Sequence, residues 1–527
     1  MVKHWLPLSG NPYMKMPDIV TNSSASLRSS PRFGKIDLRH VAWFSLFIVA
    51  GCIASINPVF WLGCLAGAVV LWLCKLAFGF LRLEFWQVIA VVTITGYVVL
   101  NYGFENVAIH VGSFPVLITY GMMYGALALA IFAHRNLVMK ALHEPALLCV
   151  LAVLGLTFFH LLSDVPAFGS LAFRDATMCF DGVFVLMGLL WARKSDSPEF
   201  LAKWLLVVFV LNMFYSFTLP WTEKLWSWSP ESGAFLPVPI LGNFRGTGDS
   251  LLAGAVFCIC VGSYVVSRPR WLMPVLALGQ LLGIAITQVR RMYLGIVVVV
   301  VILVLAGEIK KFARLFILVP AALAVLFMVT SVGGFEISGR IGPVNLAFFQ
   351  DHLRSISGAE NTPGSDPQTR VIMASQAFQH FLAHPVFGEG FGQPVVNVID
   401  GDNGTATRTP HNSTMTYLAR LGAVGIILWI AFHWCLCARF VYAFRRRRSC
   451  DKRLYALILW FFLFYVVFMV GSFVESPFEY PAHAIPFYFL MGFALGLIRW
   501  HMSPGNKGDH RLTAFASGVE NATSNQF

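Results

Sequence analysis

The sequence predicts an all-α, polytopic integral membrane protein with about 14 transmembrane helices and a partly helical periplasmic loop. Of its 527 residues, 57% are hydrophobic and 12% are charged, which is about half the charged fraction of a soluble domain. The mean hydropathy is +0.70, and apolar runs close to the length that crosses a bilayer recur along the chain. This composition excludes a disordered chain, a collagen-like repeat and a soluble multidomain enzyme.

Fourteen apolar segments are candidate spans, because each approaches the roughly 20 residues that a helix needs to cross a bilayer. In chain order they lie near residues 41–56, 58–74, 85–102, 111–133, 145–162, 173–191, 200–220, 250–266, 271–287, 291–306, 315–333, 413–438, 454–473 and 484–499.

The segment before the first span, residues 1–40, is polar and rich in serine, without the apolar core of a signal peptide. We therefore expect it to be a cytoplasmic N-terminal tail. The rest of the chain is expected to comprise spans 1–11 over 41–333 with an external loop at 221–249, a large periplasmic loop over 334–410, spans 12–14 over 411–499, and a cytoplasmic C-terminal tail over 500–527.

The basic residues indicate how the spans are oriented. With both termini in the cytoplasm, 28 of the 38 Lys and Arg residues fall on cytoplasmic segments, including the run 445–448, as the positive-inside rule requires. The net charge of +12 is therefore a signal of topology, and we expect no nucleic-acid partner. Ten cations remain outside, and nine of them are Arg.

The loop 334–410 is expected to contain a helix near 343–356 and an amphipathic helix over 368–383, which Asp366-Pro367 begins and a turn from His384 to Gly390 follows. This loop is too small for a soluble catalytic domain. Any chemistry must therefore be built at the outer face of the membrane, from loops and span ends.

Four of the outer arginines are candidate ligands for phosphate, because a guanidinium keeps its charge and presents a planar fork to phosphate oxygens. They are Arg245, Arg290, Arg291 and Arg370. Arg370 opens the loop helix, where a cation opposes the helix dipole but forms an anion site with the free N–H groups. For any one Arg taken alone, snorkelling or pairing with a carboxylate is the favoured interpretation.

His411 is the candidate base. It lies in Thr409-Pro410-His411-Asn412, where the long loop re-enters the membrane, and near a helix N-terminus its ring tends to stay neutral and able to accept a proton. A helix-capping or interfacial role is equally consistent with the sequence. Two other features have weaker interpretations: Arg420 is expected to face away from His411, and Arg174 and Asp181 are expected to form a structural pair.

No Walker A, GxGxxG or HExxH motif is present, and we expect neither a cofactor nor a metal. The motifs that are present resemble those of the bacterial O-antigen ligase/polymerase family, the Wzy-type membrane glycosyltransferases. They are Arg370 opening a loop helix, the turn His384-Pro385-Val386-Phe387-Gly388-Glu389-Gly390, His411-Asn412 followed by Leu421-Gly422-Ala423-Val424-Gly425, Thr287-Gln288-Val289-Arg290, and Phe244-Arg245-Gly246-Thr247-Gly248.

The resemblance implies a metal-independent, GT-C-like glycosyltransferase in the bacterial inner membrane, with its active site facing the periplasm. Its donor would be an undecaprenyl-diphosphate-linked glycan and its acceptor a glycan or lipid A-core, with a chain-length regulator and a flippase as further candidate partners besides the lipid bilayer. Arg245, Arg290, Arg291 and Arg370 would bind the diphosphate, and His411 would take the proton of the attacking hydroxyl.

The resemblance favours a polymerase of surface polysaccharide, O-antigen or exopolysaccharide, because polymerases of that family tend to have more spans and two sizeable external loops, as this chain does. An O-antigen ligase joining the glycan to lipid A-core is the alternative, and a protein O-oligosaccharyltransferase is a third possibility within the same chemistry. A glycan flippase is the alternative from another functional class.

Overall fold

The computed structural model describes residues 83–502, apart from 112–113, 195, 233–237, 245, 267–268, 270, 309, 311–318, 325–326, 329–336, 355–366 and 400–405. The chain divides into two units, residues 1–49 and 50–527, and every described residue belongs to the second unit. The candidate spans at 41–56 and 58–74, most of the span at 315–333, the N-terminal tail, most of the C-terminal tail and Arg245 lie outside the described residues.

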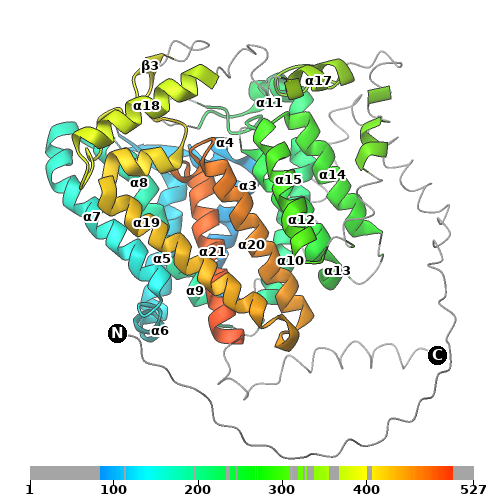
Figure 1. Ribbon diagram of the computed structural model, residues 1–527, viewed down its shortest axis with the longest axis horizontal. Coiled ribbons are helices and arrows are strands. Elements are labelled where there is room, and N and C mark those ends of the chain that lie inside the picture. Colours follow the sequence, from blue (N-terminus) through cyan, green and yellow to red (C-terminus); the bar gives the residue numbers. More distant parts are fainter. Residues whose placement is uncertain are drawn as a thin grey trace, which may run out of the picture. The chain divides into compact units, whose positions relative to one another are not determined.

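The described residues form an almost entirely helical bundle, which confirms the predicted all-α membrane fold (Figure 1). Its first half contains α3 (Phe85–Leu100), α4 (Tyr102–Glu105), α5 (Ile118–Ala133), α6 (Arg135–Ala141), α7 (Pro145–Phe168), α8 (Ser170–Phe180), η1 (Asp181–Val183), α9 (Phe184–Trp191), α10 (Ser197–Ser216), η2 (Leu219–Trp221) and α11 (Thr222–Trp228). Its second half contains α12 (Thr247–Cys260), α13 (Gly262–Val265), α14 (Leu272–Thr287), α15 (Arg290–Leu305), α17 (Leu346–Arg354), α18 (Pro367–Ala383), α19 (Ser413–Arg445), η5 (Arg447–Ser449), α20 (Lys452–Ser472), η6 (Pro477–Glu479) and α21 (Pro481–His501).

Strand structure is confined to two antiparallel hairpins in the described part of the chain. β1 (Ala108–Val111) pairs with β2 (Phe114–Leu117), and β3 (Val398–Ile399) pairs with β4 (Ala406–Thr407). The two helices expected in the large loop are present as α17 and α18, and Pro367 is the first residue of α18.

Five of the described helices are long and apolar enough to cross a membrane, namely α7, α10, α19, α20 and α21. The count becomes six if α5 and α6, which meet at 98°, form one bent span. Several others are shorter: α3, α14 and α15 have 16 residues each, about 24 Å of helix against a hydrocarbon core of about 30 Å. The predicted count of 14 spans is therefore not confirmed.

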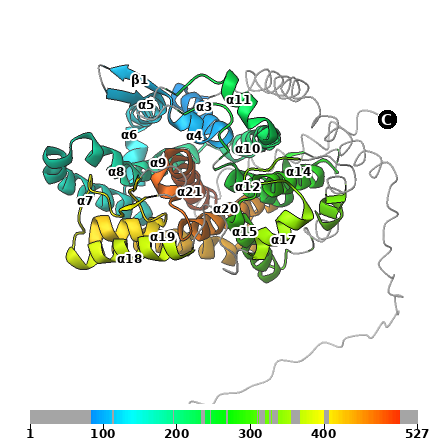
Figure 2. The ribbon, with the colours of Figure 1, turned by 90° about the horizontal axis from the view of Figure 1, so that it is seen from above.

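The interior helix of the bundle is α21, whose apolar window is 94% buried, and it packs beside α9 (Figure 2). Small residues allow this contact. A Cβ atom added to Gly188 of α9 would lie 2.0 Å from the Phe489 carbonyl oxygen, and one added to Gly492 of α21 would lie 2.0 Å from the Val185 carbonyl oxygen. Close backbone approach at small residues is the usual basis of helix packing in membranes.

The two ends of the bundle differ in charge and structure, and α19 connects them. Its N-cap, Asn412, lies at the end that carries α4, α11, α17 and α18, here called the loop end (Figure 1). Its last residue, Arg445, begins the arginine run at the opposite end, here called the basic end. At the basic end the buried carboxylate of Glu144 binds Arg439 at 2.9 Å and Arg499 at 3.2 Å.

Candidate active site at the loop end of the bundle

Three regions singled out in the sequence meet at one short segment, Phe473–Glu475, here called the strap, which connects α20 to η6. Arg370 Nη1 donates a hydrogen bond of 2.6 Å to the Val474 carbonyl. Asn412 Nδ2 donates one of 3.0 Å to the Phe473 carbonyl. The third region contributes Arg291, whose guanidinium forms an ion pair with the carboxylate of Glu475. The strap therefore joins α15, α18 and the start of α19.

Arg290 and Arg370 bring two positive charges together at this place. Arg290 is the first residue of α15 and Arg370 lies in the first turn of α18, and their charges are close enough to interact unfavourably. Arg370 is exposed, and within the described residues no carboxylate forms an ion pair with it. Two like charges held side by side create a local positive potential that an anion would relieve.

Arg291 has a different environment from Arg370, although it follows Arg290 directly. Its side chain is 6% exposed and its guanidinium binds the carboxylates of both Asp249 and Glu475. His483 Nδ1 lies 3.7 Å from the same Asp249 carboxylate. The charge of Arg291 is therefore balanced within the protein, and its guanidinium links α12, α15 and the strap.

Arg245 itself lies outside the described residues, but the residues on either side of it are described. Phe244 stacks on Tyr215 with ring centroids 4.8 Å apart. Gly246 lies against His483, since a Cβ atom there would be 2.1 Å from His483 Cε1. The Arg/Gly segment thus borders the network of His483, Asp249 and Arg291.

His411 has a strained backbone conformation that the sequence did not predict. Three non-glycine residues in the described part of the chain have positive φ: Asn101 at 52°, Gln288 at 52° and His411 at 50°. Such a conformation is uncommon outside glycine, although Asn and His tolerate it better than most residues, and it is enriched at functional sites. Gln288 immediately precedes Val289 and Arg290, and His411 immediately precedes Asn412. Two of the three strained positions therefore flank residues that contact the strap or lie beside Arg370.

The glycine-rich turn His384–Gly390 explains why α19 is interrupted. Gly422 has a φ of 63° and breaks the helical geometry within α19. A Cβ atom at Gly422 would lie 2.5 Å from the Gly388 amide nitrogen, so the turn packs directly into the break. There the Gly390 amide donates a hydrogen bond of 3.0 Å to the Arg420 carbonyl. The turn thus satisfies a backbone group that the interrupted helix leaves without its usual partner.

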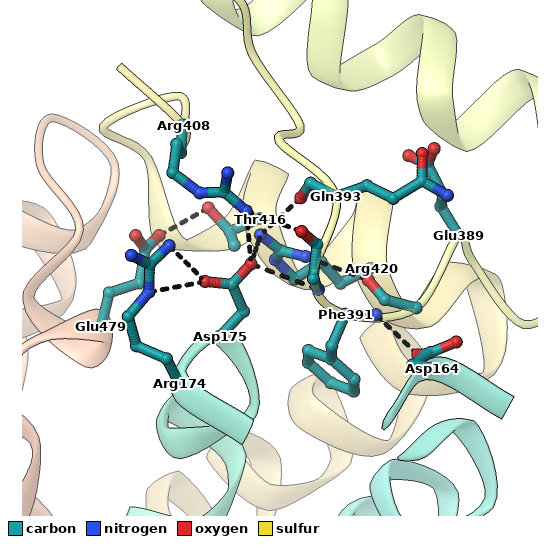
Figure 3. Close-up of polar contacts among 12 residues, drawn as sticks. Asp164, Arg174, Asp175, Glu389, Phe391, Gln393, Arg408, Thr416, Arg420 and Glu479 are labelled. Atoms are coloured by element: carbon teal, nitrogen blue, oxygen red, sulfur yellow. Dashed lines mark hydrogen bonds and ion pairs between the residues drawn. The ribbon is translucent and has the colours of Figure 1, made fainter. Parts of the chain in front are cut away.

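A second arginine cluster surrounds Asp175 of α8, whose side chain is 7% exposed (Figure 3). Arg420 Nη2 contacts Asp175 Oδ2 at 2.9 Å, Arg408 Nη2 contacts the same oxygen at 3.3 Å, and Arg174 Nη2 contacts Oδ1 at 2.9 Å. Arg420 also donates to the Gly390 carbonyl at 3.1 Å. This Asp175 cluster fixes the glycine-rich turn between α8 and α19.

One interpretation of these residues is corrected by the structure, and one contact was not predicted. The expected pair of Arg174 and Asp181 does not form, because Arg174 bonds its neighbour Asp175 while Asp181 is fully buried with Tyr120 Oη 3.5 Å away. The sequence missed the role of Arg420 as the buried partner of Asp175, because that contact joins residues 245 positions apart.

Comparison with known protein families supplies the decisive observation. Residues 274–430 match the family model described as O-Antigen ligase. This stretch of the chain is therefore similar to the O-antigen ligase family. The matched residues cover most of α14, then α15, α17, α18, the glycine-rich turn and α19 to beyond its break. The match therefore includes Arg290, Arg291, Arg370 and His411. Arg245 precedes it. A comparison with curated proteins found no match.

Proposed function

We propose that this protein is a membrane glycosyltransferase that transfers an undecaprenyl-diphosphate-linked glycan to a sugar acceptor at the periplasmic face of the inner membrane. The observation that carries the proposal is the convergence of Arg290, Arg370 and the His411-Asn412 pair around the strap. The match to the O-antigen ligase family covers the same residues.

The donor diphosphate is assigned to Arg290 and Arg370, with Arg245 as a third ligand from the adjacent segment. A diphosphate relieves the repulsion between the first two guanidinium groups, and each can present paired N–H donors to phosphate oxygens. Arg291 is already bound to two carboxylates, so it supports the diphosphate site indirectly, by holding Asp249 and Glu475 in place.

In the reaction the acceptor hydroxyl oxygen forms a bond to C1 of the donor sugar, and the bond between C1 and the diphosphate oxygen breaks. The bonding electron pair leaves with the diphosphate, whose growing charge the arginines stabilise. The hydroxyl proton passes to His411, which acts as the general base. Its position beside the helix N-cap Asn412 favours the neutral ring that this role requires.

The periplasmic assignment follows from the two ends of α19. The run Arg445–Arg448 lies at the basic end and His411 lies next to the N-cap at the loop end. If the arginine run faces the cytoplasm, as the positive-inside rule requires, the candidate site faces the periplasm.

A polymerase is our preferred assignment within this chemistry, with an O-antigen ligase as the alternative; the two differ in the acceptor. Lipid analysis of a deletion strain separates them. Loss of a polymerase leaves single-repeat glycan on the lipid carrier or lipid A-core, and loss of a ligase leaves polymer on undecaprenyl diphosphate. A strain that confines unextended lipid-linked glycan to the cytoplasmic leaflet would instead indicate a flippase and would contradict the proposal.

A further inference from the structure

A polar hollow lies next to the strap, which contributes Glu475 to its lining. It is open to solvent, and its space of about 320 Å³, which includes that open part, lies between α4, the start of α15, the strap and the start of α21. The side chains that define its character are Tyr102, Glu105, Arg291, Glu475, Tyr480 and His483. Within the described residues this hollow and the pair Arg290 and Arg370 are connected through the strap, because Glu475 lines the hollow and the neighbouring Val474 carbonyl binds Arg370.

The hollow is acidic, in contrast to the Arg290 and Arg370 region. Its lining includes the carboxylates of Glu105 and Glu475, and the single guanidinium in that lining, Arg291, is also bound to Asp249. Arg291 is thus bound by two carboxylates, and a third, that of Glu105, lines the same hollow. A phosphate group would be repelled here, whereas hydroxyl and ammonium groups would find acceptors.

The lining of the hollow also has a donor without a partner. Arg291 Nε is buried and has no hydrogen-bond partner within the described residues, in a side chain that is 6% exposed. A buried donor left unsatisfied costs roughly 1–3 kcal/mol, so a ligand oxygen that reached it would be favoured. Carboxylate acceptors beside one unsatisfied donor match a sugar ring edge, whose hydroxyl groups both donate and accept hydrogen bonds.

Two tyrosines form the aromatic part of the hollow. The rings of Tyr102 and Tyr480 meet edge to face with centroids 6.1 Å apart. The C–H face of a pyranose is apolar and packs favourably on an aromatic ring, while its hydroxyl edge needs polar partners. The hollow offers both kinds of partner within one small volume.

We propose that this hollow binds the acceptor sugar, as a neutral or amino-bearing pyranose whose hydroxyl edge faces Glu475 and Arg291. The inference rests on the proposed glycosyltransferase function and adds to it a separate, acidic acceptor subsite. The strap then lies between two subsites of opposite charge, with the phosphorylated donor on the Arg370 side and the unphosphorylated acceptor on the Glu475 side.

The test uses the full chain in nanodiscs and two separate binding measurements. Saturation-transfer NMR with methyl glucoside, methyl glucosaminide and methyl glucoside 6-phosphate probes the hollow, and native mass spectrometry with undecaprenyl diphosphate probes the arginines. Glu475→Gln and Tyr480→Leu should each weaken binding of the first two glycosides about tenfold without weakening lipid binding. Arg370→Ala should weaken binding of undecaprenyl diphosphate and leave binding of the two glycosides unchanged. Glu199→Gln, an exposed Glu on α10, is the matched control and should change neither.

The glycoside 6-phosphate should bind more weakly than the neutral glycoside to the wild type. Absence of glycoside binding to the wild type, or binding that both hollow variants retain, would overturn the acceptor subsite even if the lipid binds normally. Failure of the wild type to bind undecaprenyl diphosphate would count against the proposed donor, and it would leave the glycoside measurement as an independent test of the hollow.

Discussion

Two groups of arginines at the loop end look alike in the sequence and differ in their environment. In the Asp175 cluster, Arg174, Arg408 and Arg420 share one buried carboxylate. In the other group, Arg290 and Arg370 lie close enough for their positive charges to repel. The first group binds its anion within the protein, while the second concentrates charge at a position suited to an anion from outside. A shared buried carboxylate thus makes the arginines of the Asp175 cluster part of the fold, whereas the exposed Arg370 has no carboxylate partner among the described residues.

The same distinction applies within a single pair of neighbours. Arg290 opens α15 beside Arg370, whereas Arg291 is buried between Asp249 and Glu475. Successive residues of a helix point in directions about 100° apart, so one can face the ligand while the next packs into the protein. We therefore expect substitutions in the two groups to separate activity from stability.

The largest effect on activity is expected at the base. His411→Ala should lower transfer activity by about 10²- to 10⁴-fold, because the attacking hydroxyl loses its proton acceptor. The melting temperature of the purified protein should stay close to that of the wild type. His143→Ala, which removes an exposed histidine at the basic end, is the control. Wild-type transfer by the His411 variant would remove this residue from the mechanism.

The largest effect on stability is expected in the Asp175 cluster. Arg420→Ala should destabilise the protein by roughly 3–5 kcal/mol, because the carboxylate of Asp175 would lose its best-placed buried partner. Chemical denaturation in detergent measures the change. Arg174→Ala removes the most exposed of the three arginines and should cost far less. Equal stability of the Arg420 variant and the wild type would contradict the structural role of this cluster.

Arg370 should show the opposite behaviour to Arg420. Arg370→Ala is expected to lower activity about 100-fold, since one stabilising group for the leaving diphosphate is lost, while stability stays nearly constant because the side chain is exposed. Arg370→Lys keeps the charge without the planar fork, so its activity should lie between that of the wild type and that of Arg370→Ala. Arg354→Ala on the neighbouring helix α17 is the matched control. A lysine variant as active as the wild type would argue against paired hydrogen bonds to phosphate.

The smallest expected effect depends on pH and concerns Glu479, which joins η6 to α19 through a hydrogen bond of 2.6 Å from Thr416 (Figure 3). Burial raises the pKa of Glu479 above its ordinary value of 4.5, although hydrogen bonds from Thr416 and Thr409 act in the opposite direction. Because the pKa of this carboxyl is higher in the folded protein than in the unfolded chain, its contribution to folding stability is greatest at low pH. That contribution is lost as the pH rises through the raised pKa.

Denaturation of the wild type and of Glu479→Gln across this pH range measures the effect. The stability of the wild type relative to the variant should fall as the pH rises above about 4.5. A difference that stays constant, or that grows with pH, would contradict the raised pKa.

Much of the fold follows from local sequence, because the apolar runs of α7, α19, α20 and α21 are long and apolar enough to cross a membrane. The interruptions of the helices do not follow from the local sequence. The predicted span at 173–191 is divided by the short helix η1, and α19 is interrupted at Gly422. Both interruptions lie where the chain meets distant partners, and an apolar run gives no indication of such contacts.

The site was predictable to a similar extent. The Arg and His motifs identified Arg370 and Arg291, which contact the strap, and His411, whose neighbour Asn412 contacts it, because these residue types reveal their chemistry. The strap itself has no motif. Neither Asp175 nor the acidic hollow could be predicted from the sequence, since both depend on contacts between residues far apart in the chain. Residue type thus predicts which charged residues belong to the candidate site better than it predicts the residues that hold them in place.

The most direct test of the central claim is transfer by the purified full chain supplied with a synthetic undecaprenyl-diphosphate-linked oligosaccharide and a sugar acceptor. Release of undecaprenyl diphosphate is measured together with the extended glycan. We expect the wild type and Arg174→Ala to release both products in equal amounts, and Arg370→Ala and His411→Ala to release almost none while remaining folded. Equal rates in the wild type and in these two variants would contradict a catalytic site built from Arg370 and His411.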